Sequence, residues 1–188
     1  MNNIIIKPKS IIKSEILNKE FLFTPSRYKY IEIKNSNTLP INKIFIESKT
    51  NVNLDNNKGY YNYVEIGSIN NDTGSVSASV KKSIEISSNT VSNLKLGDIL
   101  ISTVRTYLGG IGIINEDLEN LVASKALIIL RELQISKDKF YLFGILRSPF
   151  FIKQVSIILN ASMYPRMERD YFKKLYIPFP TTKNHQNP

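Results

Sequence analysis

The fold class is decided by one stretch, LKLGDILISTVRTYLGGIGII, at residues 94–114. Gly97 and Asp98 predict a turn, because both residue types favour the backbone conformations that turns require. The three aliphatic residues that follow, Ile99–Ile101, predict a short buried strand. In LGGIGII, at residues 108–114, three glycines indicate bulges or places where two backbone segments approach closely. The stretch therefore predicts a buried strand that leads into a glycine-rich surface loop.

Strand and turn signals continue on both sides of that stretch. The segment YYNYVEIG (60–67) is aromatic and β-branched, which favours a strand, and SINNDTG (68–74) is a turn cluster. Downstream, the apolar residues 126–130 predict a further strand. Upstream, INKIFIES (41–48) alternates apolar and polar residues and predicts a strand, whereas NVNLDNNKG (51–59) predicts a loop. The middle of the chain is therefore expected to be rich in strands.

Helices are expected only late in the chain. Ser136 is a suitable N-cap for a first helix, with Asp138 favourable in its first turn. Ser148 is expected to cap a second helix that begins at Pro149, where the missing N–H costs no hydrogen bond. The segment YIPFP (176–180) is expected to be extended, because its prolines disfavour helix. An aromatic stripe is assigned to the core: Phe140, Phe143, Phe150 and Phe151.

These elements together predict an α+β fold, a mixed, strand-rich domain with a helical pair near the C-terminus. We expect the domain core at residues 59–180, an N-terminal segment at residues 1–58 and a polar tail at residues 181–188. Within the N-terminal segment, KSEILNKEFLF (13–23) predicts a short helix that ends before Pro25.

Composition narrows the function classes. The 188 residues carry a formal net charge of +9, which favours a polyanionic partner, although a chain this rich in Lys, Asn and Ile also becomes basic through composition alone. There is no cysteine, so disulfides and thiolate metal sites are excluded. The apolar runs are too short to span a bilayer, and MNNIIIKPKS at the start lacks the features of a secretion signal. We therefore expect a cytoplasmic protein without a membrane partner.

Nucleases and base methyltransferases that act on DNA both need characteristic residue motifs. Glu-x-Lys pairs occur at residues 32–34 and 47–49, but the first aspartate is Asp55, so neither pair has the upstream Asp that metal-dependent nucleases of the commonest restriction type use. The Asn/Asp-Pro-Pro-aromatic loop of base methyltransferases is absent from the sequence. The single histidine, His185, lies in the polar tail and offers no multi-ligand zinc site. We expect no catalytic residue, no metal and no cofactor.

Four motifs occur in a fixed order along the chain. They are YVEIGSIN (63–70), LKLGDILISTVRTYLGGIGII (94–114), LVASKALIILR (121–131) and the stretch 140–180, which ends in YIPFP. The first motif is a strand with the pattern I..IN, and the second is a strand with the pattern GDIL.S followed by a glycine loop. The third is a strand that follows a turn with a serine. The fourth is a helical pair followed by the pattern L..IP.P. In this order and spacing the chain resembles the target recognition domain of type I restriction-modification specificity subunits, with residues 20–58 matching more loosely.

The resemblance implies sequence-specific binding of double-stranded DNA without catalysis. In that family the specificity subunit reads the DNA, and each recognition domain reads one half of a split target. A separate modification subunit, an adenine methyltransferase, methylates the flipped adenine. A motor-nuclease restriction subunit cuts unmodified DNA. These two subunits are therefore the protein partners that the resemblance implies.

The sequence also departs from a complete specificity subunit, which has two recognition domains joined by long helices. Here one such domain is present, and TTKNHQNP (181–188) stands where the family continues with a helix. The alternatives are a half-length subunit that acts as a homodimer or with a second recognition domain, a fragment, and a domain of a fused restriction-methylation enzyme. A protein-interaction module with incidental basic charge is the alternative from a different class.

Candidate DNA-binding residues are polar, basic or aromatic side chains at strand ends and in the late basic loop 161–174. They are Asn70, Asn71, Ser102, Thr103, Arg105, Tyr107, Lys125, Tyr164, Arg166 and Arg169. Arginine can bind guanine through two hydrogen bonds or hold a phosphate, and asparagine suits the edge of adenine.

Each assignment has a structural alternative. Arg105 could form a surface ion pair, the two asparagines could simply make a turn, and Glu168 or Asp170 could pair with the neighbouring arginines. We assign structural roles to the turn and loop residues Gly97, Asp98, Gly109 and Gly110.

The two arginine-bearing loops are expected to share one face. The chain must reach the surface where polar residues replace the aliphatic side chains after Ile101. The segment 163–174 is polar and basic between two apolar elements, so it is also expected to be a surface loop. We therefore predict that Arg105 and Arg166 lie on the same DNA-facing surface.

Overall fold

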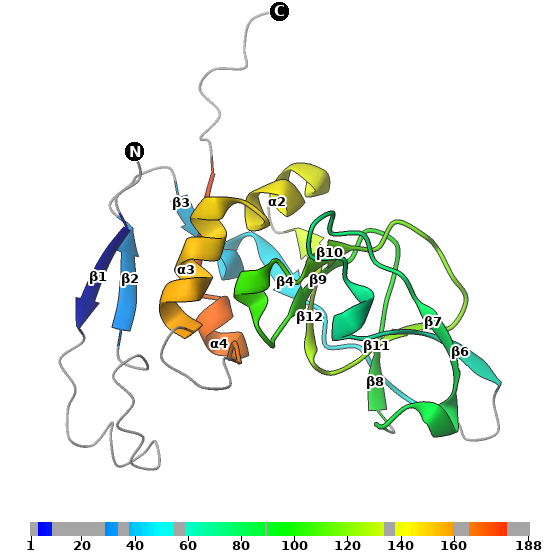
Figure 1. Ribbon diagram of the computed structural model, residues 1–188. Coiled ribbons are helices and arrows are strands. Elements are labelled where there is room, and N and C mark those ends of the chain that lie inside the picture. Colours follow the sequence, from blue (N-terminus) through cyan, green and yellow to red (C-terminus); the bar gives the residue numbers. More distant parts are fainter. Residues whose placement is uncertain are drawn as a thin grey trace, which may run out of the picture.

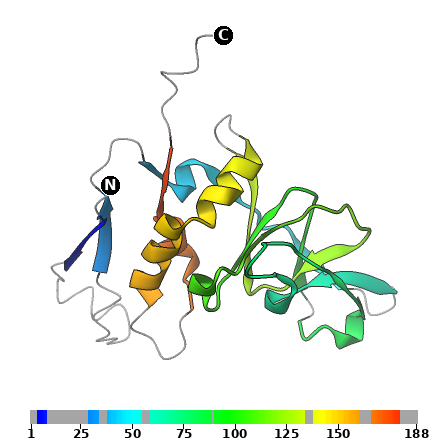
Figure 2. The same ribbon diagram turned by 45° about the horizontal axis from the view of Figure 1, so that its top comes forward.

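The computed structural model describes residues 4–8, 29–33, 38–54, 59–88, 90–133, 138–159 and 166–179. Figure 1 shows a helical part next to a strand-rich part, and the turned view in Figure 2 keeps these two parts adjacent. The expected α+β architecture, with two helices near the C-terminus, is confirmed. The predicted helix at residues 13–23 and the polar tail lie outside the described residues.

The strands in chain order are β1 (Ile4–Pro8), β2 (Lys29–Ile33), β3 (Thr38–Pro40), β4 (Phe45–Glu47), β5 (Asn51–Asn53), β6 (Tyr60–Val64), β7 (Ser79–Lys82), β8 (Thr90–Asn93), β9 (Ile99–Ser102), β10 (Ile111–Ile113), β11 (Leu121–Ala123), β12 (Leu127–Leu133) and β13 (Tyr176–Pro178). The α-helices are α2 (Lys139–Leu146), α3 (Pro149–Leu159) and α4 (Arg169–Phe172). Short 3₁₀ turns are η2 (Ile41–Lys43), η3 (Ile66–Ser68), η4 (Ser83–Glu85) and η5 (Thr106–Leu108).

The sheets join strands that are distant in sequence. Within the described residues, one antiparallel sheet has the order β10-β9-β12-β4, and a second has the order β5-β8-β11-β6-β7, in which β11 and β6 run parallel. Two further antiparallel pairs are β1–β2 and β3–β13. Strands β3, β4 and β5 therefore pair with later strands, so the sheets include residues from before position 58, the end of the expected N-terminal segment.

The core lies on both faces of β9 and β12. Ile99 and Ile101 face one hydrophobic cluster, which also contains Phe151 of α3 and Phe172 of α4. Leu100, between them, faces a second cluster built with side chains of the other sheet, including Val64 and Ala123. A strand that is buried on both faces has apolar residues at every position, which is why this stretch shows no alternation. The predicted buried strand at Ile99–Ile101 is confirmed.

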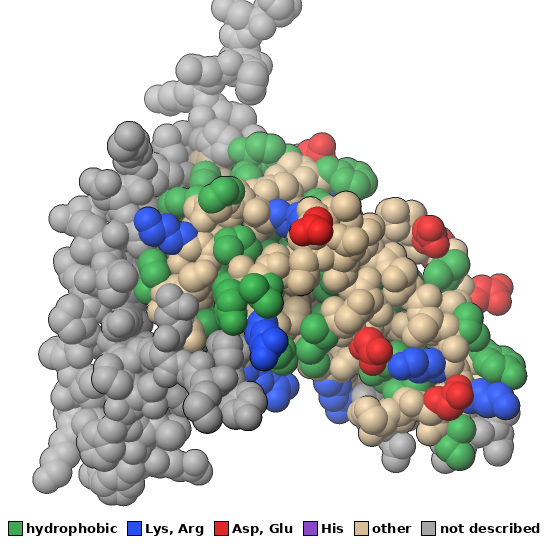
Figure 3. Space-filling model, viewed as in Figure 1, with side chains coloured by type: hydrophobic (Ala, Val, Ile, Leu, Met, Phe, Trp, Pro, Cys, Tyr) green, Lys and Arg blue, Asp and Glu red, His purple; other side chains and the backbone are tan. Residues whose placement is uncertain are grey.

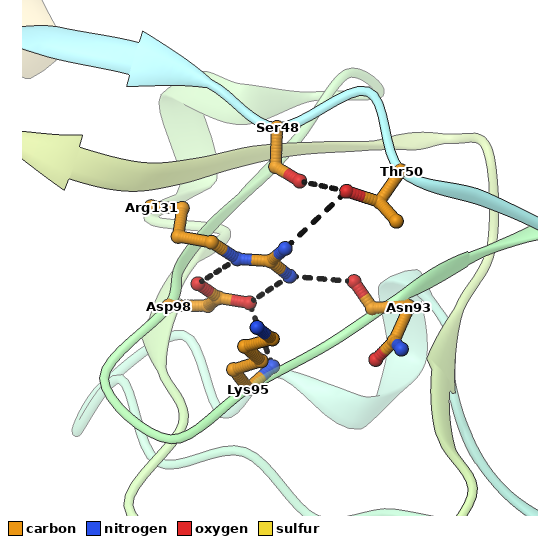
Figure 4. Close-up of polar contacts among 6 residues, drawn as sticks. All are labelled: Ser48, Thr50, Asn93, Lys95, Asp98 and Arg131. Carbon is orange, nitrogen blue, oxygen red and sulfur yellow. Dashed lines mark hydrogen bonds and ion pairs between the residues drawn. The ribbon is translucent and has the colours of Figure 1, made fainter.

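A buried ion pair holds the turn before β9 (Figure 4). The Arg131 guanidinium donates to both carboxylate oxygens of Asp98, at 3.0 and 2.9 Å, and to the carbonyl oxygen of Asn93 at 2.8 Å. The second Asp98 oxygen also accepts the backbone N–H of Lys95 at 2.8 Å, which closes the turn. Gly97 adopts a φ of 80°, so this position of the turn favours glycine. The structural roles expected for Gly97 and Asp98 are confirmed.

The helical pair begins where short polar side chains can cap it. The Asp138 carboxylate accepts the backbone N–H of Phe140 at 2.8 Å, so the N-cap of α2 is Asp138 and not the predicted Ser136, which lies outside the described residues. Ser148 precedes α3, and its hydroxyl accepts the N–H of Phe151 at 3.4 Å, which confirms the predicted cap before Pro149.

Other expectations are corrected by the structure. Phe140 is 67% exposed and does not belong to the core, because it lies in the first turn of α2 on the solvent side. The strand expected over residues 41–48 is limited to Phe45–Glu47, and Ile41 instead begins a 3₁₀ turn. Asn51–Asn53, expected in a loop, forms β5 by pairing with β8. These three differences arise from tertiary contacts that local patterns do not encode.

In the described part of the chain, no single helix is long and apolar enough to cross a bilayer, and only α2 and α3 together, across a bend of 48°, pass a test of length and composition.

Candidate nucleic-acid interface

The two arginine-bearing segments lie side by side. Val104, after β9, forms an antiparallel bridge with Arg166, and the backbone N–H of Met167 donates to the Thr103 carbonyl oxygen at 2.6 Å. Residues that are more than 60 positions apart in sequence therefore meet at the end of β9. The predicted juxtaposition of the Arg105 and Arg166 segments is confirmed.

Arg105 is exposed at the tip of the segment that follows β9. Its backbone adopts a left-handed conformation, with φ 49° and ψ 39°, immediately before η5. Among the described residues, no hydrogen bond or ion pair engages the side chain of Arg105 or of Arg166. Both guanidinium groups are therefore free to bind an anion or a base edge.

Apolar and basic side chains border these arginines. Val104 and Leu108 are 38% and 52% exposed, although each is aliphatic. Lys125, in the turn between β11 and β12, is also exposed. Figure 3 shows lysine and arginine side chains along the lower edge of the molecule, between the helical and strand-rich parts, with hydrophobic side chains next to them. Basic groups mixed with apolar ones suit a surface that holds phosphates and contacts bases.

Ser102 and Thr103 are structural in this arrangement. They are only 1% and 3% exposed. The Ser102 hydroxyl donates to the Val104 carbonyl oxygen at 2.8 Å, and the Thr103 hydroxyl donates to the Ala126 carbonyl oxygen at 2.8 Å. Their prediction as DNA contacts is corrected, because both hydroxyls are buried and bonded to the backbone.

Tyr107 and the two asparagines also have structural partners. Tyr107 is half-buried and packs against the helical side of the core. The Asn70 side-chain oxygen accepts the backbone N–H groups of Asp72 and Thr73, at 2.9 and 3.0 Å, which is the hydrogen bonding of an Asx turn. Asn70 and Asn71 nevertheless remain exposed, so their predicted contact with DNA stays a prediction.

Arg169 joins three separate segments of the chain. Its guanidinium forms an ion pair with Glu47 of β4 and donates to the carbonyl oxygens of Lys125 and Leu127, at 2.9 and 3.0 Å. Arg169 therefore fixes α4 against the turn that carries Lys125. Its Nη groups are thus bonded within the chain, and the predicted contact of Arg169 with DNA stays a prediction.

Glu47 is the acidic centre of this arrangement. Its side chain is 6% exposed, and Lys173 contacts it at 2.9 Å in addition to Arg169. Burial by itself raises the pKa of the Glu47 carboxyl, but hydrogen bonds and charges from Lys173 and Arg169 outweigh burial and hold this pKa below its ordinary value of 4.5. Glu47 is therefore ionised at neutral pH and neutralises the charges of Arg169 and Lys173.

Arg147 was not among the predicted residues. It follows α2, and its guanidinium donates to backbone carbonyl oxygens in the turn 70–74 and in the glycine segment 109–111. The sequence offers no direct signal for such contacts, because carbonyl groups are present at every residue. Tyr164, which was predicted, lies outside the described residues, and its contact with DNA stays a prediction.

Within the described residues, no group of three or more His, Cys, Asp or Glu side chains is placed to hold a metal ion.

Comparison with known proteins gives the family. A family model described as the type I restriction modification DNA specificity domain matches residues 33–187. No curated protein matches the chain. Two solved structures share the fold, at TM-scores of 0.63 and 0.61 and with 22% sequence identity in each case.

The first solved structure comes from work described as "Structural basis underlying complex assembly and conformational transition of the type I R-M system", and the second is the HsdS subunit from Thermoanaerobacter tengcongensis. Each match covers 76% of this chain but 37% of the solved chain, so this chain corresponds to little more than a third of either structure. Because the family model matches most of its residues, the chain belongs to the family of type I restriction modification DNA specificity domains.

Proposed function

We propose that this chain recognises a specific DNA sequence as the specificity subunit, or half-subunit, of a type I restriction-modification system. The observation that carries the proposal is the pair of exposed, unpaired arginines on two segments joined by the Val104–Arg166 bridge. Lys125 adds a third cation from the neighbouring β11–β12 turn. Charge of one sign on adjoining segments is suited to the DNA backbone, and an arginine can also discriminate between bases.

The chemistry of modification and cleavage is assigned to partner subunits. The exposed residues that carry the proposal, Arg105, Arg166 and Lys125, supply cationic contacts. We propose that an adenine methyltransferase subunit and a motor-nuclease subunit act on DNA that this chain has selected. Membership of the specificity family and a fold shared with an HsdS subunit support this division of roles. The protein itself is then expected to leave DNA uncut and unmethylated.

Selection from a pool of duplexes with randomised base pairs tests the proposal directly. The chain is expected to enrich a limited set of sequences, and log K for an enriched duplex is expected to fall with log salt at a slope of about −4 to −5, for about 4 to 6 neutralised phosphates. Saturable binding that enriches no sequence would contradict sequence recognition. A flat salt response would favour the protein-interaction module instead.

Single substitutions distinguish whether Arg105 contacts a base or a phosphate. Arg105→Ala is expected to cost about 1–3 kcal/mol of binding to the enriched duplex and to relax preference at one base pair if Arg105 reads a base. If Arg105 holds a phosphate, binding to all duplexes weakens alike and the salt slope decreases by about one unit. Lys95→Ala is the matched control, because Lys95 is exposed at the opposite end of β9 and its loss is expected to leave preference unchanged.

A further inference from the structure

Arg147 occupies the two-residue connection between α2 and α3. Its backbone N–H donates to the Phe143 carbonyl oxygen at 3.2 Å, and the next residue, Ser148, caps α3. The Arg147 guanidinium lies 5.7 Å from the centre of the Phe143 ring. The backbone of Arg147 is therefore held between two helices. The Arg147 guanidinium extends from these helices toward the strand-rich part.

The guanidinium holds two separate loops by their backbones. We call residues 70–74 the asparagine turn and residues 102–110 the Arg105 loop. One terminal nitrogen of Arg147 donates to Asn71 and Asp72 in the asparagine turn, at 2.9 and 2.6 Å to the carbonyl oxygens. The other donates to the carbonyl oxygen of Gly109 in the Arg105 loop, at 3.3 Å, and to that of Ile111, which directly follows the loop, at 2.7 Å.

Two glycines make room for this arrangement. A Cβ atom at Gly109 would lie 2.9 Å from the Asn71 carbonyl oxygen, so only glycine lets the two loops approach so closely. A Cβ atom at Gly74 would lie 2.6 Å from the Phe143 ring and 2.8 Å from the Arg147 guanidinium. Both glycines also have a positive φ, of 90° and 75°. The asparagine turn, the Arg105 loop and Arg147 therefore form one tightly fitted contact.

Arg147 has little capacity left to contact DNA itself. A guanidinium carries five N–H groups, of which four lie on its terminal nitrogens. Within the described residues, each terminal nitrogen of Arg147 already donates to two carbonyl oxygens, which matches the hydrogens it has. Its charge is consequently directed into the protein and not toward a phosphate.

We propose that Arg147 is a positioning residue that fixes the distance between the asparagine turn and the Arg105 loop, so that both read neighbouring base pairs in one register. This inference rests on the proposed DNA-reading function. The other end of the Arg105 loop is already tied by the bond from Met167 to Thr103. Arg147 supplies the tie at the Gly109 end, and a base contact depends on positions held to a fraction of an ångström.

Arg147→Lys tests the proposal with the charge retained. Lysine presents one compact ammonium, which cannot reach both loops as the two separated nitrogens of arginine do. We expect this variant to stay folded but to lose about tenfold or more in its preference for the enriched duplex over a scrambled duplex, the scale of one lost base contact. Its affinity for the scrambled duplex and its salt slope are expected to equal those of the wild type.

Arg131→Lys is the matched control, since Arg131 also donates to a buried partner and to a carbonyl, but at the other end of β9. It is expected to lower the melting temperature and to preserve the duplex preference. Amide hydrogen exchange of residues 70–74 and 109–111 is expected to quicken in Arg147→Lys and not in Arg131→Lys.

Three results would overturn the inference. Equal loss of preference in the two arginine variants at equal melting temperatures would reduce Arg147 to a general contributor to stability. A salt slope lower by one unit in Arg147→Lys would make Arg147 a phosphate contact. An unchanged preference in Arg147→Lys would remove the positioning role, whereas a wild-type chain that enriches no sequence overturns the proposed function and the inference with it.

Discussion

At the scale of single residues, Arg105 combines exposure with a backbone conformation that side chains rarely adopt. Its φ of 49° places it in the left-handed region, where a Cβ atom costs about 1–2 kcal/mol. The hydrogen bonds of its neighbours hold it there, including those of Thr103 and the N–H of Leu108, which donates to the Arg105 carbonyl oxygen at 2.9 Å. The fold therefore tolerates local strain at a residue that we propose contacts DNA.

This strain predicts an unusual order of stabilities. Arg105→Gly is expected to be about 1 kcal/mol more stable than Arg105→Ala, because glycine adopts the left-handed region freely. Both variants are expected to lose the same DNA affinity, since both lack the guanidinium. Urea unfolding measures the first difference and duplex titration the second. At Lys95, which has a negative φ, the order should be reversed, with alanine at least as stable as glycine; the same order at both sites would contradict the strain.

Glu47 predicts how stability depends on pH. Its pKa is lowered in the folded state, so its contribution to the free energy of unfolding is fully present above about pH 4.5 and is lost as pH falls through the folded-state pKa. Glu47→Gln is expected to destabilise the protein by about 1–3 kcal/mol at pH 7, since it leaves Arg169 and Lys173 without their carboxylate. The difference from wild type should shrink between pH 5 and pH 3, about the usual range of carboxyl titration. Urea unfolding at several pH values checks this, and a difference that stays constant with pH would contradict it.

At the scale of elements, the structure shows which sequence patterns were sufficient to predict a strand or a core residue. The aliphatic run Ile99–Ile101 predicted its strand because burial on both faces requires an apolar residue at every position. The polar segment Asn51–Asn53 gave no such signal, because its strand depends on pairing with β8. Phe140 was assigned to the core from its residue type, but helix α2 starts with its first turn toward solvent.

The candidate site was predictable to a smaller extent. Arg105 and the meeting of its loop with Arg166 followed from polar residues at the end of a buried strand. The role of Arg169 did not, because its partner Glu47 lies 122 residues away in the sequence. Arg147 was missed for a different reason: it binds backbone carbonyls, which leave no trace in the identity of the residues that carry them.

The Asp98–Arg131 pair joins the turn before β9 to β12 and predicts strong coupling. Asp98→Ala is expected to cost about 3–5 kcal/mol, because it leaves Arg131 half-buried without its carboxylate. In a double-mutant cycle with Arg131→Met, the coupling is expected to be about 1–3 kcal/mol by urea unfolding. The exposed pair Lys81–Glu65, at 3.5 Å, is the control and should couple by less than about 1 kcal/mol. Additive losses at Asp98 and Arg131 would show that the pair is not a unit.

At the scale of the whole molecule, the helical and strand-rich parts share β9 and β12 as a common wall. One face of these strands packs on α2, α3 and α4, and the other on side chains of the five-stranded sheet. The helical part and the strand-rich part therefore both depend on β9 and β12 to complete their hydrophobic clusters. The segments that we propose face DNA originate at this wall, since the Arg105 loop continues directly from β9 and Lys125 lies in the turn that leads into β12. Both segments are therefore attached to strands that are buried on both faces.

The way in which the Arg105 loop is held has a consequence for how new specificities arise. Its ties to Met167 and Arg147 run through carbonyl oxygens of the loop, at Thr103 and Gly109, and every amino acid supplies a backbone carbonyl. The exposed side chains of Val104, Arg105 and Leu108 take no part in those ties. Under the proposed DNA-reading function, inherited changes at these three positions redirect the protein to another target without loss of these ties, so that a lineage changes what it recognises faster than it changes its shape.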